Sequence, residues 1–468
     1  MRYSVDRLLK ENVDKYGNNG YIYEKVNGQY QEHTFREFCE DVYRFADDIH
    51  NKTTGNTVAI YAQNSYRYMV LDTAVMAYIG ISVTLSKEWT FYDLDRIFAD
   101  GKINTLVYDE PRQLTALTLK KKYPGINILN INELGLQGEY KLLPENDLNE
   151  CCKVIFSSGT TGVPKGVMLC QKNMFACWDN LYKRTLLSCN DIAYLFLPLN
   201  YTYSGICNFL YSLITGMKIY LCSDTRKILE EIQAIKPTAF CAVPLIFERM
   251  YQYSKETGIP PDKMLGGNVR LMFSAGAFLS PEIRKYFKLY KMNLIEAYGL
   301  TETSSIISAE YSHSYDDFTS CGKIFENVDV KISEEGEILA KGENIFLGYF
   351  GNEELTKRCF TKDGYFRTGD IGQVRDGKLY LSGRKKRVII LSNGENVDPA
   401  EIEHCFDREK NVNKAKVFEK DSKIHAVLYV ADKIDAEEMV ERINGTLPKY
   451  SRIRSYEVIS DSISVRMK

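Results

Sequence analysis

The stretch VIFSSGTTGVPKGVML, residues 154–169, determines how this chain is interpreted. It consists of a β-type run, a loop of Ser, Thr and Gly with one lysine, and a second β-type run. Glycines allow a loop to approach a phosphate group closely, and Lys165 adds a point charge. The stretch therefore predicts a strand–loop–strand element that binds phosphate. The competing interpretation is a polar turn without a ligand.

This loop differs from a P-loop in two respects. Lys165 is followed by Gly166 rather than by Ser or Thr, and the next residues, VML, predict a strand. A P-loop requires a helix at that position. We therefore expect a different class of nucleotide-binding element.

The sequence around this loop predicts layers of helices and strands. From about residue 34 to residue 300, helical patterns such as TFREFCEDVYRFADDI alternate with short apolar runs such as TVAIYA. This alternation predicts an α/β fold with largely parallel sheets. After about residue 320, short alternating strands with glycine turns predict a β-rich region. From about residue 387, the capping pattern of Asp398 and Pro399 predicts the start of a small α+β domain.

Composition indicates a globular protein with a small-molecule partner. The chain has 468 residues, 44% of them hydrophobic, and its 60 basic residues nearly balance 62 acidic ones. This balance gives no attraction to nucleic acid or to anionic membranes. Two apolar segments, residues 68–85 and 205–222, are interrupted by polar residues and glycines. We interpret each as a buried helix followed by a buried strand rather than as a membrane span.

Cysteine spacing and the N-terminus favour the cytoplasm. The twelve cysteines include no C-x-x-C pair, so we expect them to be reduced and mostly buried. The first residues, MRYSVDRLLKENVDKYG, carry charges throughout and predict neither a signal peptide nor an anchor.

Two further groups of residues suit a nucleotide. YGLTET, residues 298–303, follows the β-type run NLIEA and places a ring, a hydroxyl and a carboxylate at the end of a strand, where ligands gather in α/β sheets. A two-residue turn at Asp376–Gly377 predicts a hairpin that sets Asp370 opposite Gly383, next to Arg384. A carboxylate beside a guanidinium suits a ribose diol and a phosphate. The alternative is an exposed ion pair of little consequence.

The loop SSGTTGVPKG closely resembles the phosphate loop of the adenylate-forming superfamily, which contains acyl-CoA synthetases, peptide-synthetase adenylation domains and beetle luciferases. Four later segments resemble the superfamily's other motifs in the same order, and the resemblance covers essentially the whole chain. They are YGLTET (residues 298–303), GEILAKGENIFLGY (336–349), YFRTGD (365–370) and GRKKRVIILSNGENVDPAEIE (383–403).

The resemblance implies a fold and a reaction. The fold is a large N-terminal domain of layered α/β subdomains with a β-rich subdomain, residues 1–383, then a hinge at 384–388 and a small mobile C-terminal domain, 389–468. The reaction is ATP- and Mg²⁺-dependent activation of a carboxylic acid to acyl-AMP with release of pyrophosphate. The acyl group then passes to a thiol, either CoA or the phosphopantetheine of an acyl carrier protein.

The resemblance also implies site residues. Tyr298 stacks on adenine, Thr301 contacts phosphate, Glu302 holds Mg²⁺, and Lys386 lies at the hinge. The residues of the nucleotide site are Ser157, Ser158, Gly159, Thr160, Thr161, Gly162, Lys165, Ala275, Gly276, Ala297, Tyr298, Gly299, Thr301, Asp370 and Arg384. Catalysis is assigned to Lys165, Thr301, Glu302, Arg466 and Lys468.

The C-terminus departs from the superfamily pattern. Related enzymes carry a catalytic lysine in a segment resembling T-x-x-x-K-I-K, whereas this sequence ends SDSISVRMK. Arg466 aligns with that lysine and Lys468 with the next basic position. Arginine keeps the charge without the compact ammonium. Three interpretations stay open: slower adenylation, use of Lys468 after a shift of register, or a chain that continues beyond residue 468.

Substrate class follows from weaker patterns. The segment LPLNYTYSG, residues 197–205, has Tyr201 where fatty-acid ligases carry a histidine, and the Phe-Asp-x-Ser pattern of amino-acid-activating members is missing. Residues 236–250 and 383–397 most resemble medium- and long-chain fatty-acyl ligases, so we expect a hydrophobic acid. The substrate pocket is assigned to Tyr201, Tyr203, Gly276, Ala277 and Gly299. Pocket wall and ordinary core packing both stay open for Tyr201, Tyr203, Cys207 and Phe209. The alternatives are a catalytically weakened homologue and an enzyme that activates aryl or amino acids for peptide synthesis.

Overall fold

The computed structural model of this chain describes most of its 468 residues. The described ranges are residues 3–89, 91–136, 138–157, 165–276, 279–310, 317–384, 389–390, 396–397, 399–420, 423–447 and 451–460.

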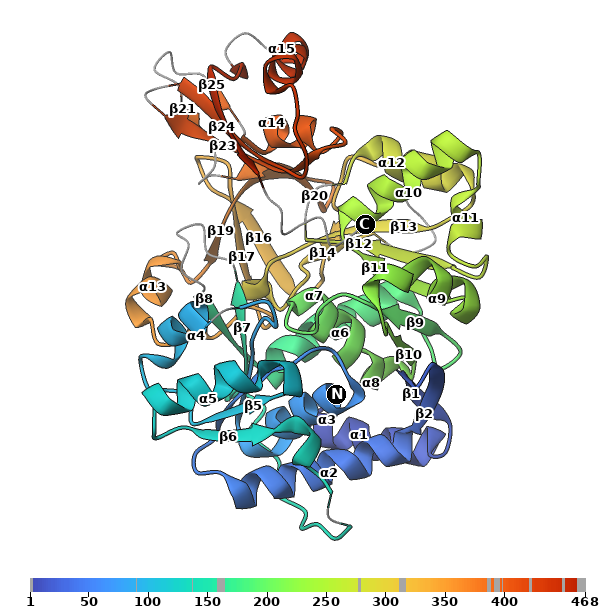
Figure 1. Cartoon of the computed structure of the whole chain (residues 1–468), viewed down its shortest axis with the longest axis vertical. Coiled ribbons are helices and arrows are strands. Elements are labelled where there is room, and N and C mark those ends of the chain that lie inside the picture. Colours follow the sequence, from blue (N-terminus) through green and yellow to red (C-terminus); the bar gives the residue numbers. More distant parts are fainter. Residues whose placement is uncertain are drawn as a thin grey trace. The chain divides into compact units, whose positions relative to one another are not determined.

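The chain forms two compact units, drawn in Figure 1. Unit 1 comprises Met1–Val330, Ala340–Phe366 and Gly377–Leu379. Unit 2 comprises Lys331–Leu339, Arg367–Asp376 and Tyr380–Lys468. The predicted hinge at residues 384–388 stays a prediction, since its central residues lie outside the described ranges.

A seven-stranded sheet in unit 1 contains the two strands on either side of the Ser-, Thr- and Gly-rich loop. The strand order is β18-β8-β7-β4-β3-β5-β6, in which β4, β3, β5, β6 and β7 are parallel and β8 and β18 complete an antiparallel edge. The strands are β3 (Thr57–Tyr61), β4 (Ile81–Thr84), β5 (Thr105–Tyr108), β6 (Asn127–Asn130), β7 (Cys151–Ser157), β8 (Lys165–Cys170) and β18 (Gly348–Tyr349). Strands β3 and β5 are buried along their whole length, as parallel strands covered on both faces require. Leu94 of α4 (Phe91–Phe98) and Ala116 of α5 (Gln113–Lys122) belong to the core on one face.

A second sheet of unit 1 has the strand order β15-β14-β13-β12-β11-β9-β10-β1-β2. Strands β1 and β9–β13 are parallel, whereas β2, β14 and β15 are antiparallel to their neighbours. The strands are β1 (Gly20–Val26), β2 (Gln29–Thr34), β9 (Ile192–Leu195), β10 (Lys218–Leu221), β11 (Ala239–Ala242), β12 (Leu271–Ser274), β13 (Leu294–Tyr298), β14 (Ser308–Ala309) and β15 (Lys323–Ile324). Helices α9 (Ile228–Ile235), α10 (Pro244–Thr257), α11 (Pro261–Met264) and α12 (Pro281–Leu289) share one apolar core with β11–β13.

The other helices of unit 1 connect and cover these sheets. They are α1 (Val5–Tyr16), α2 (Phe35–Lys52), α3 (Tyr66–Ala74), α6 (Gln171–Thr185), α7 (Thr202–Ser204), α8 (Ser212–Thr215) and α13 (Glu353–Arg358), with short 3₁₀ turns η2 (Glu110–Arg112), η3 (Ile131–Glu133), η5 (Thr225–Lys227) and η6 (Thr301–Thr303). Two segments are π-helices, η1 (Val75–Ile79) and η4 (Gly205–Leu210). Helix α2 begins with a capping box in which Thr34 and Glu37 satisfy each other's backbone N–H groups.

Four strands contain residues of both units. They neighbour one another in the order β16-β17-β19-β20, and their bounds are β16 (Val328–Ile332), β17 (Glu337–Gly342), β19 (Phe366–Arg375) and β20 (Lys378–Arg384).

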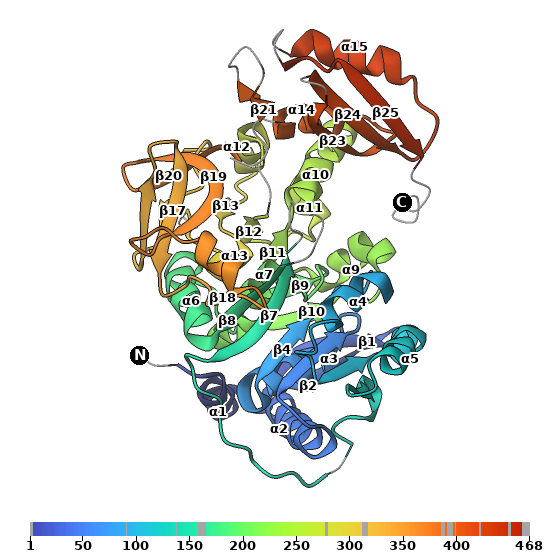
Figure 2. The same ribbon diagram turned by 90° about the vertical axis from the view of Figure 1, so that its left-hand side faces the viewer.

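The rest of unit 2 is a small α+β assembly. Strands β23 (Val412–Lys420), β24 (Lys423–Val430) and β25 (Ser455–Ser460) form a three-stranded sheet, and β21 (Ile389–Ile390) pairs with β22 (Asn396–Val397). Helices α14 (Pro399–Phe406) and α15 (Ala436–Thr446) pack on the three-stranded sheet through Phe406, Val440 and Ile443. Figure 2 shows α15 beside β24 and β25.

The fold class predicted from the sequence is confirmed. The chain is an α/β protein with a large N-terminal part and a small α+β part at the C-terminus. The apolar segment at residues 205–222 is η4, α8 and β10, and the one at 68–85 is a helix followed by β4. Among the described residues, no helix combines the length and the apolar character needed to cross a membrane. All twelve cysteines are free, and each is buried or half-buried.

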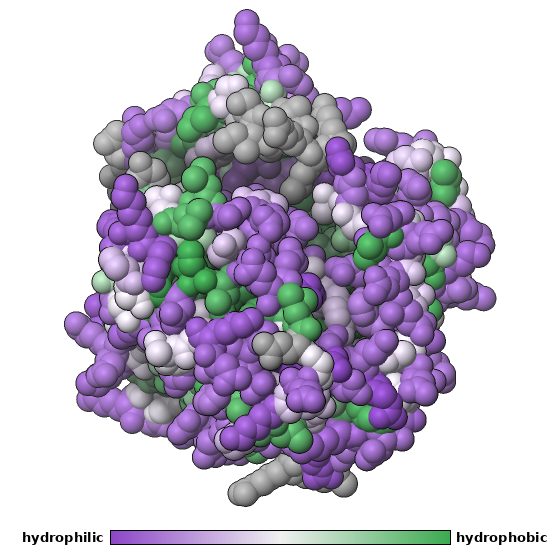
Figure 3. Space-filling model, turned by 60° about the horizontal axis from the view of Figure 1, so that its bottom comes forward, coloured by the Kyte–Doolittle hydropathy of each residue, from purple (hydrophilic) through white to green (hydrophobic). Residues whose placement is uncertain are grey.

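Most of the surface seen in Figure 3 is hydrophilic, with hydrophobic side chains in small separate groups. Single exposed apolar residues such as Leu114 and Leu289 are ordinary on protein surfaces.

Candidate functional site

The strand–loop–strand element is present. Strands β7 and β8 pair in antiparallel fashion, with Ser157 opposite Lys165 at the base of the loop. The loop's ends are therefore held by a regular ladder of β-type residues, as the apolar runs on both sides predicted. The predicted loop residues Ser158, Gly159, Thr160, Thr161 and Gly162 lie outside the described residues.

Lys165 and Glu302 are brought together through a residue to which the sequence analysis gave no role. The ammonium group of Lys165 lies 5.6 Å from the ring centroid of Tyr349, at the end of β18. The Tyr349 hydroxyl donates a hydrogen bond to Oε1 of Glu302 at 2.8 Å. The cation, the ring and the buried carboxylate thus form one cluster in unit 1.

Local structure fixes the position of Glu302. Strand β13 ends at Tyr298, and the 3₁₀ turn η6 follows at once. The backbone N–H of Leu300 donates to Oγ1 of Thr303 at 2.9 Å, which closes the turn. The carbonyl of Glu302 accepts a hydrogen bond from the N–H of Phe346 at 2.9 Å. The motifs at residues 298–303 and 336–349 therefore meet directly.

Thr301 lies in the same turn and contacts a second segment. The hydroxyl oxygens of Thr301 and Thr202 are 3.0 Å apart in a hydrogen bond that Thr202 donates. Thr202 begins α7, the short helix that follows LPLN. The candidate phosphate residue is therefore joined to the segment to which the sequence analysis assigned the acyl pocket.

The two titratable groups near Glu302, the phenol of Tyr349 and the thiol of Cys359, both have raised pKa values. Burial, together with the negative charge of Glu302, raises the pKa of Tyr349, so its phenol keeps the proton that it donates. Burial and the same carboxylate raise the pKa of the Cys359 thiol to about 11. At neutral pH, both groups are uncharged beside Glu302.

The ends of β12 and β13 hold the residues predicted to contact the nucleotide. Ala275, Ala297 and Tyr298 are buried there. Gly276 has φ +91° and open space where a side chain would be. At Gly299, an added Cβ would overlap with the carbonyl of Ser305, so the backbone requires glycine there. The predicted Ala277 lies outside the described residues.

The predicted hairpin is present, and its strands contain residues of both units. Asp376 and Gly377 have φ of +50° and +72°, the left-handed pair that a two-residue turn between β19 and β20 demands. Asp370 is buried in β19, and its N–H donates to Oγ1 of Thr368 at 3.1 Å. Arg384 ends β20, but its side chain is not among those described, so its pairing with Asp370 stays a prediction.

Three more predicted residues, Lys386, Arg466 and Lys468, lie outside the described residues.

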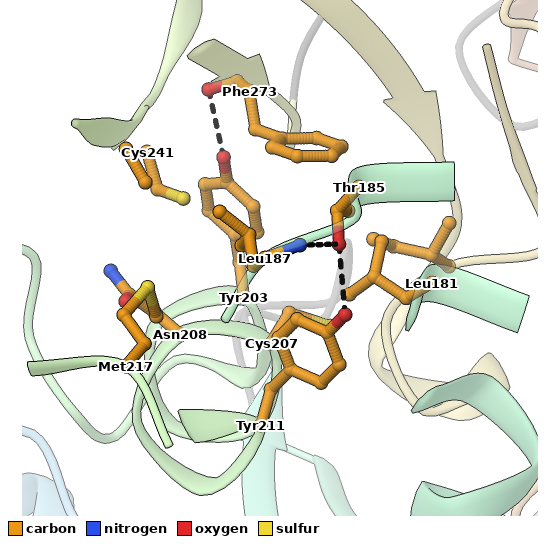
Figure 4. Close-up of a pocket in the computed structure, with 12 residues that line it drawn as sticks. Leu181, Thr185, Leu187, Tyr203, Cys207, Asn208, Tyr211, Met217, Cys241 and Phe273 are labelled. Atoms are coloured by element: carbon orange, nitrogen blue, oxygen red, sulfur yellow. Dashed lines mark hydrogen bonds between the residues drawn. The ribbon is translucent and has the colours of Figure 1, made fainter. Parts of the chain in front are cut away.

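The residues assigned to the acyl pocket have different positions. Tyr203 and Cys207 line a small cavity of about 10 Å³ in unit 1, shown in Figure 4. Phe209 is fully buried in the core, whereas Tyr201 is 55% exposed and does not line this cavity. The hydroxyl of Tyr203 donates to the carbonyl of Phe273 at 2.8 Å, just before the Ala275–Gly276 turn. The cavity therefore lies next to the ends of β11 and β12.

The donor set around Glu302 can hold a magnesium ion only together with phosphate. Among the described residues, no three His, Cys, Asp or Glu side chains cluster as a metal site. Mg²⁺ is typically bound by one or two carboxylates, waters and substrate phosphates. Glu302 fits that pattern, because Tyr349 orients one of its carboxylate oxygens.

These features define a nucleotide-binding α/β enzyme. Lys165, at the base of the loop, and Glu302, just after the carboxyl end of the parallel strand β13, both contact Tyr349. Ligands bind at such strand ends in α/β sheets. The chain belongs to the family of AMP-binding enzymes, because the model of that family matches residues 9–350. The C-terminal domain of AMP-binding enzymes matches residues 386–466.

Named relatives are acid–CoA ligases. The long-chain-fatty-acid–CoA ligase FadD15 of Mycobacterium bovis is 28% identical over 430 residues, which span 78% of this chain and 71% of the relative. The 2-succinylbenzoate–CoA ligase of Listeria monocytogenes is 28% identical over 399 residues, or 83% and 81% of the two chains. The chain spans 63% of the chicken ligase ACSBG2, with 25% identity. The superfamily and the acid–thiol ligase class predicted from the sequence are confirmed at this level.

Solved structures share the fold. ATP-bound MatB from Rhodopseudomonas palustris has a TM-score of 0.83 at 22% identity, with 98% of this chain and 95% of that chain covered. The MenE synthetase of Bacillus subtilis in complex with ATP and magnesium has a TM-score of 0.80 at 23% identity, with 97% and 95% covered.

Proposed function

We propose that this enzyme joins a carboxylic acid to AMP at the expense of ATP and then transfers the acyl group to a thiol. The first step forms acyl-AMP and pyrophosphate. In the second step, the thiolate attacks the acyl carbonyl, and AMP leaves with the electrons of the broken bond. CoA is the acceptor in the named relatives, and the phosphopantetheine of a carrier protein is the second candidate. The free cysteines, each buried or half-buried, support a cytoplasmic enzyme.

The Lys165–Tyr349–Glu302 cluster is the observation that supports this proposal best. A cation at the base of a phosphate loop and a buried carboxylate share one tyrosine. Negative charge grows on the departing pyrophosphate, and preorganised cations stabilise it without reorganisation. Lys165 would supply one positive charge, and Glu302 would hold a magnesium ion that would supply another.

Tyr349 has a positioning role in this proposal. Its hydroxyl keeps the carboxylate of Glu302 in one orientation, and its ring faces the Lys165 ammonium. The ring itself is held against Phe346, with centroids 4.9 Å apart. Both charged groups are therefore preorganised by one aromatic side chain.

The remaining assignments follow the family pattern. Tyr298 stacks on adenine, Thr301 contacts the phosphate, and Asp370 binds the ribose hydroxyls, with Arg384 near the phosphate. Lys386 serves as the hinge, and Arg466 and Lys468 take the place of the usual C-terminal lysine. We propose a hydrophobic acid as substrate, because the cavity beside the Ala275–Gly276 turn is lined mainly by apolar side chains.

A second candidate is a nucleotide-binding homologue with weakened adenylation. Arg466 favours it, since arginine at a point contact does not reproduce the geometry of lysine. The rate of acyl-AMP formation by the Arg466→Lys variant distinguishes the two candidate functions. A large gain in acyl-AMP formation supports the weakened homologue, whereas no change or a loss supports an adapted enzyme.

Acid-dependent release of pyrophosphate from ATP and Mg²⁺ tests the first step. The purified chain is assayed with fatty, aryl and amino acids, and hydroxylamine traps the acyl-adenylate. Lys165→Ala and Glu302→Ala are each expected to lower kcat/KM by about 100-fold or more, since each removes charge stabilisation of the leaving group.

Tyr349→Phe is the matched variant for these two. It keeps the ring under Lys165 and removes only the hydrogen bond to Glu302, so we expect a loss of about 10- to 100-fold, typical of a bond to a charged group. Full activity in both alanine variants would refute the site, and no release with any acid would refute adenylation.

A further inference from the structure

A cavity much larger than the one in Figure 4 lies beside Lys165. Its volume is about 210 Å³, more than ten times the roughly 10–15 Å³ that one water molecule needs. Lys165 and Tyr349 of the candidate site both line it. The other described lining residues come from α4, β7, β8 and the segment around α13, all in unit 1, and α4, β8 and α13 can be followed in Figure 1.

Positive charge exceeds negative charge in this cavity. The charged side chains among its described lining residues are the cations Arg96 and Lys165 and the carboxylate Asp100. Arg96 is exposed on α4, and its guanidinium forms no ion pair or hydrogen bond with any residue that the structure describes. The Asp100 carboxylate already accepts a hydrogen bond from the N–H of Lys102 at 3.1 Å. The cavity is therefore suited to an anion.

Apolar walls strengthen this preference. Ile97, Phe156, Phe350 and Leu355 line the cavity together with the charged residues, and Ile97 is buried. Walls of low dielectric constant concentrate the field of the charges between them, so two cations attract an anion more strongly there than on an open surface.

Lys165 belongs both to this cavity and to the candidate phosphate cluster. Its ammonium lies 5.6 Å from the ring centroid of Tyr349, whose hydroxyl donates to Glu302. In the proposed function, pyrophosphate departs beside Lys165. Pyrophosphate that stays there can attack acyl-AMP and reverse the step. An adjoining space with a cation of its own gives this anion a route away from acyl-AMP.

We propose that this cavity is an exit subsite for pyrophosphate, in which Arg96 replaces Lys165 as the counter-charge. The exposed Arg96 lies on the solvent side, so the anion passes from Lys165 to Arg96 and then into water. Asp100 repels the anion and keeps its binding weak enough for release. This inference rests on the proposed function and adds a subsite for its product.

Pyrophosphate binding tests the inference without any acid. We would titrate the purified enzyme with inorganic pyrophosphate and Mg²⁺ in a calorimeter. Arg96→Gln is expected to weaken pyrophosphate binding by about tenfold, because it removes a charged donor to the anion. Asp100→Asn is expected to tighten it by about threefold, because it removes a like charge. The KM for ATP in acid-dependent pyrophosphate release should change by less than about twofold in Arg96→Gln, since Arg96 acts on the departed product.

Arg249→Gln is the matched control. Arg249 is an exposed arginine of α10 that does not line the cavity, so the same change of charge there should leave pyrophosphate binding unaltered. Equal weakening by both arginine variants refutes the inference, because only net charge then matters. Unchanged binding in Arg96→Gln refutes it too, as does a tenfold rise in the KM for ATP or CoA without weaker pyrophosphate binding. Absence of release with every acid, despite the expected pyrophosphate binding, would instead refute the proposed function.

Discussion

At the scale of single residues, Glu296 shows how burial and charge compete. It lies in β13, two residues before Tyr298, and Nη1 of Arg284 is 3.1 Å from its Oε2. Burial raises the pKa of Glu296 to about 7, and the guanidinium offsets only part of this effect. The carboxylate also accepts a hydrogen bond from the N–H of Leu279. A titratable carboxyl group therefore lies two residues before Tyr298, where the turn with the candidate nucleotide residues begins.

We predict that Glu296 lowers the free energy of unfolding as the pH rises from about 4.5 to about 7. In this interval the carboxyl is ionised in the unfolded chain but protonated in the folded protein, whose excess of bound protons makes stability decrease as pH rises. Over this interval, the free energy of unfolding falls by about 3 kcal/mol in total. Apparent unfolding temperatures of the unmodified protein and Glu296→Gln, measured from pH 4.5 to 8, check this.

The glutamine variant should gain relative to the unmodified protein as pH rises to 7, with little further change above that. A difference between the two proteins that stays constant over this range would contradict the raised pKa.

At the scale of elements, the turn after β13 depends on the close approach of two backbone segments. The N–H groups of Ser304 and Ser305 donate to the carbonyls of Thr301 and Leu300, which folds the chain back over Gly299. Ser304 and Ser305 have φ of +53° and +93°, unusual for residues with side chains. This fold-back places Glu302 against β18.

We predict that Gly299→Ala disrupts this turn far more than Gly276→Ala disrupts the turn after β12. A Cβ at Gly299 overlaps with the Ser305 carbonyl, whereas at Gly276 it meets open space and only the left-handed φ is unfavourable, at about 1–2 kcal/mol. Thermal unfolding and nucleotide binding of both variants provide the measurement. Equal, small effects would show that the turn can move aside.

The elements predicted from the sequence depended on local signals. Alternation and helical periodicity indicated β3, β7, β8 and α2, because a residue's burial on one face repeats within the element itself. The π-helix η4 and the short β18 had no such signal. A π-helix differs from an α-helix only in that each hydrogen bond spans five residues instead of four. Strand β18 is only two residues long, too short to show an alternating pattern.

At the scale of the whole molecule, unit 1 contains a fully buried ion pair. Nζ of Lys153 lies 2.6 Å and 2.7 Å from the two carboxylate oxygens of Asp72, and Ser82 donates to the same carboxylate. The pair joins β7, α3 and β4, strands and a helix that support the phosphate loop. Removing either partner of such a pair destabilises the fold, because it leaves the other as a buried, unpaired charge.

We predict that the hinge residue separates the two half-reactions. Proline fixes φ, so Lys386→Pro should hinder rotation of the C-terminal domain that the family resemblance implies. Acid-dependent pyrophosphate release should fall less than threefold, while thioester formation with CoA should fall by about 100-fold. The two rates are measured separately on the same preparation, and Lys386→Ala serves as the control that keeps backbone freedom. An equal loss of both rates in the proline variant would contradict a hinge.

The order of motifs along this chain was sufficient to predict its fold class and its superfamily, and it singled out Lys165, Thr301 and Glu302 as candidate site residues. These depend on residue type and spacing, which are local properties. Contacts over long sequence separations were decided only by tertiary folding: Tyr349 bonds to Glu302 across 47 positions, and Thr202 bonds to Thr301 across 99. Whether a buried polar group has a partner depends on packing among several distant segments, and no periodicity along the chain records that.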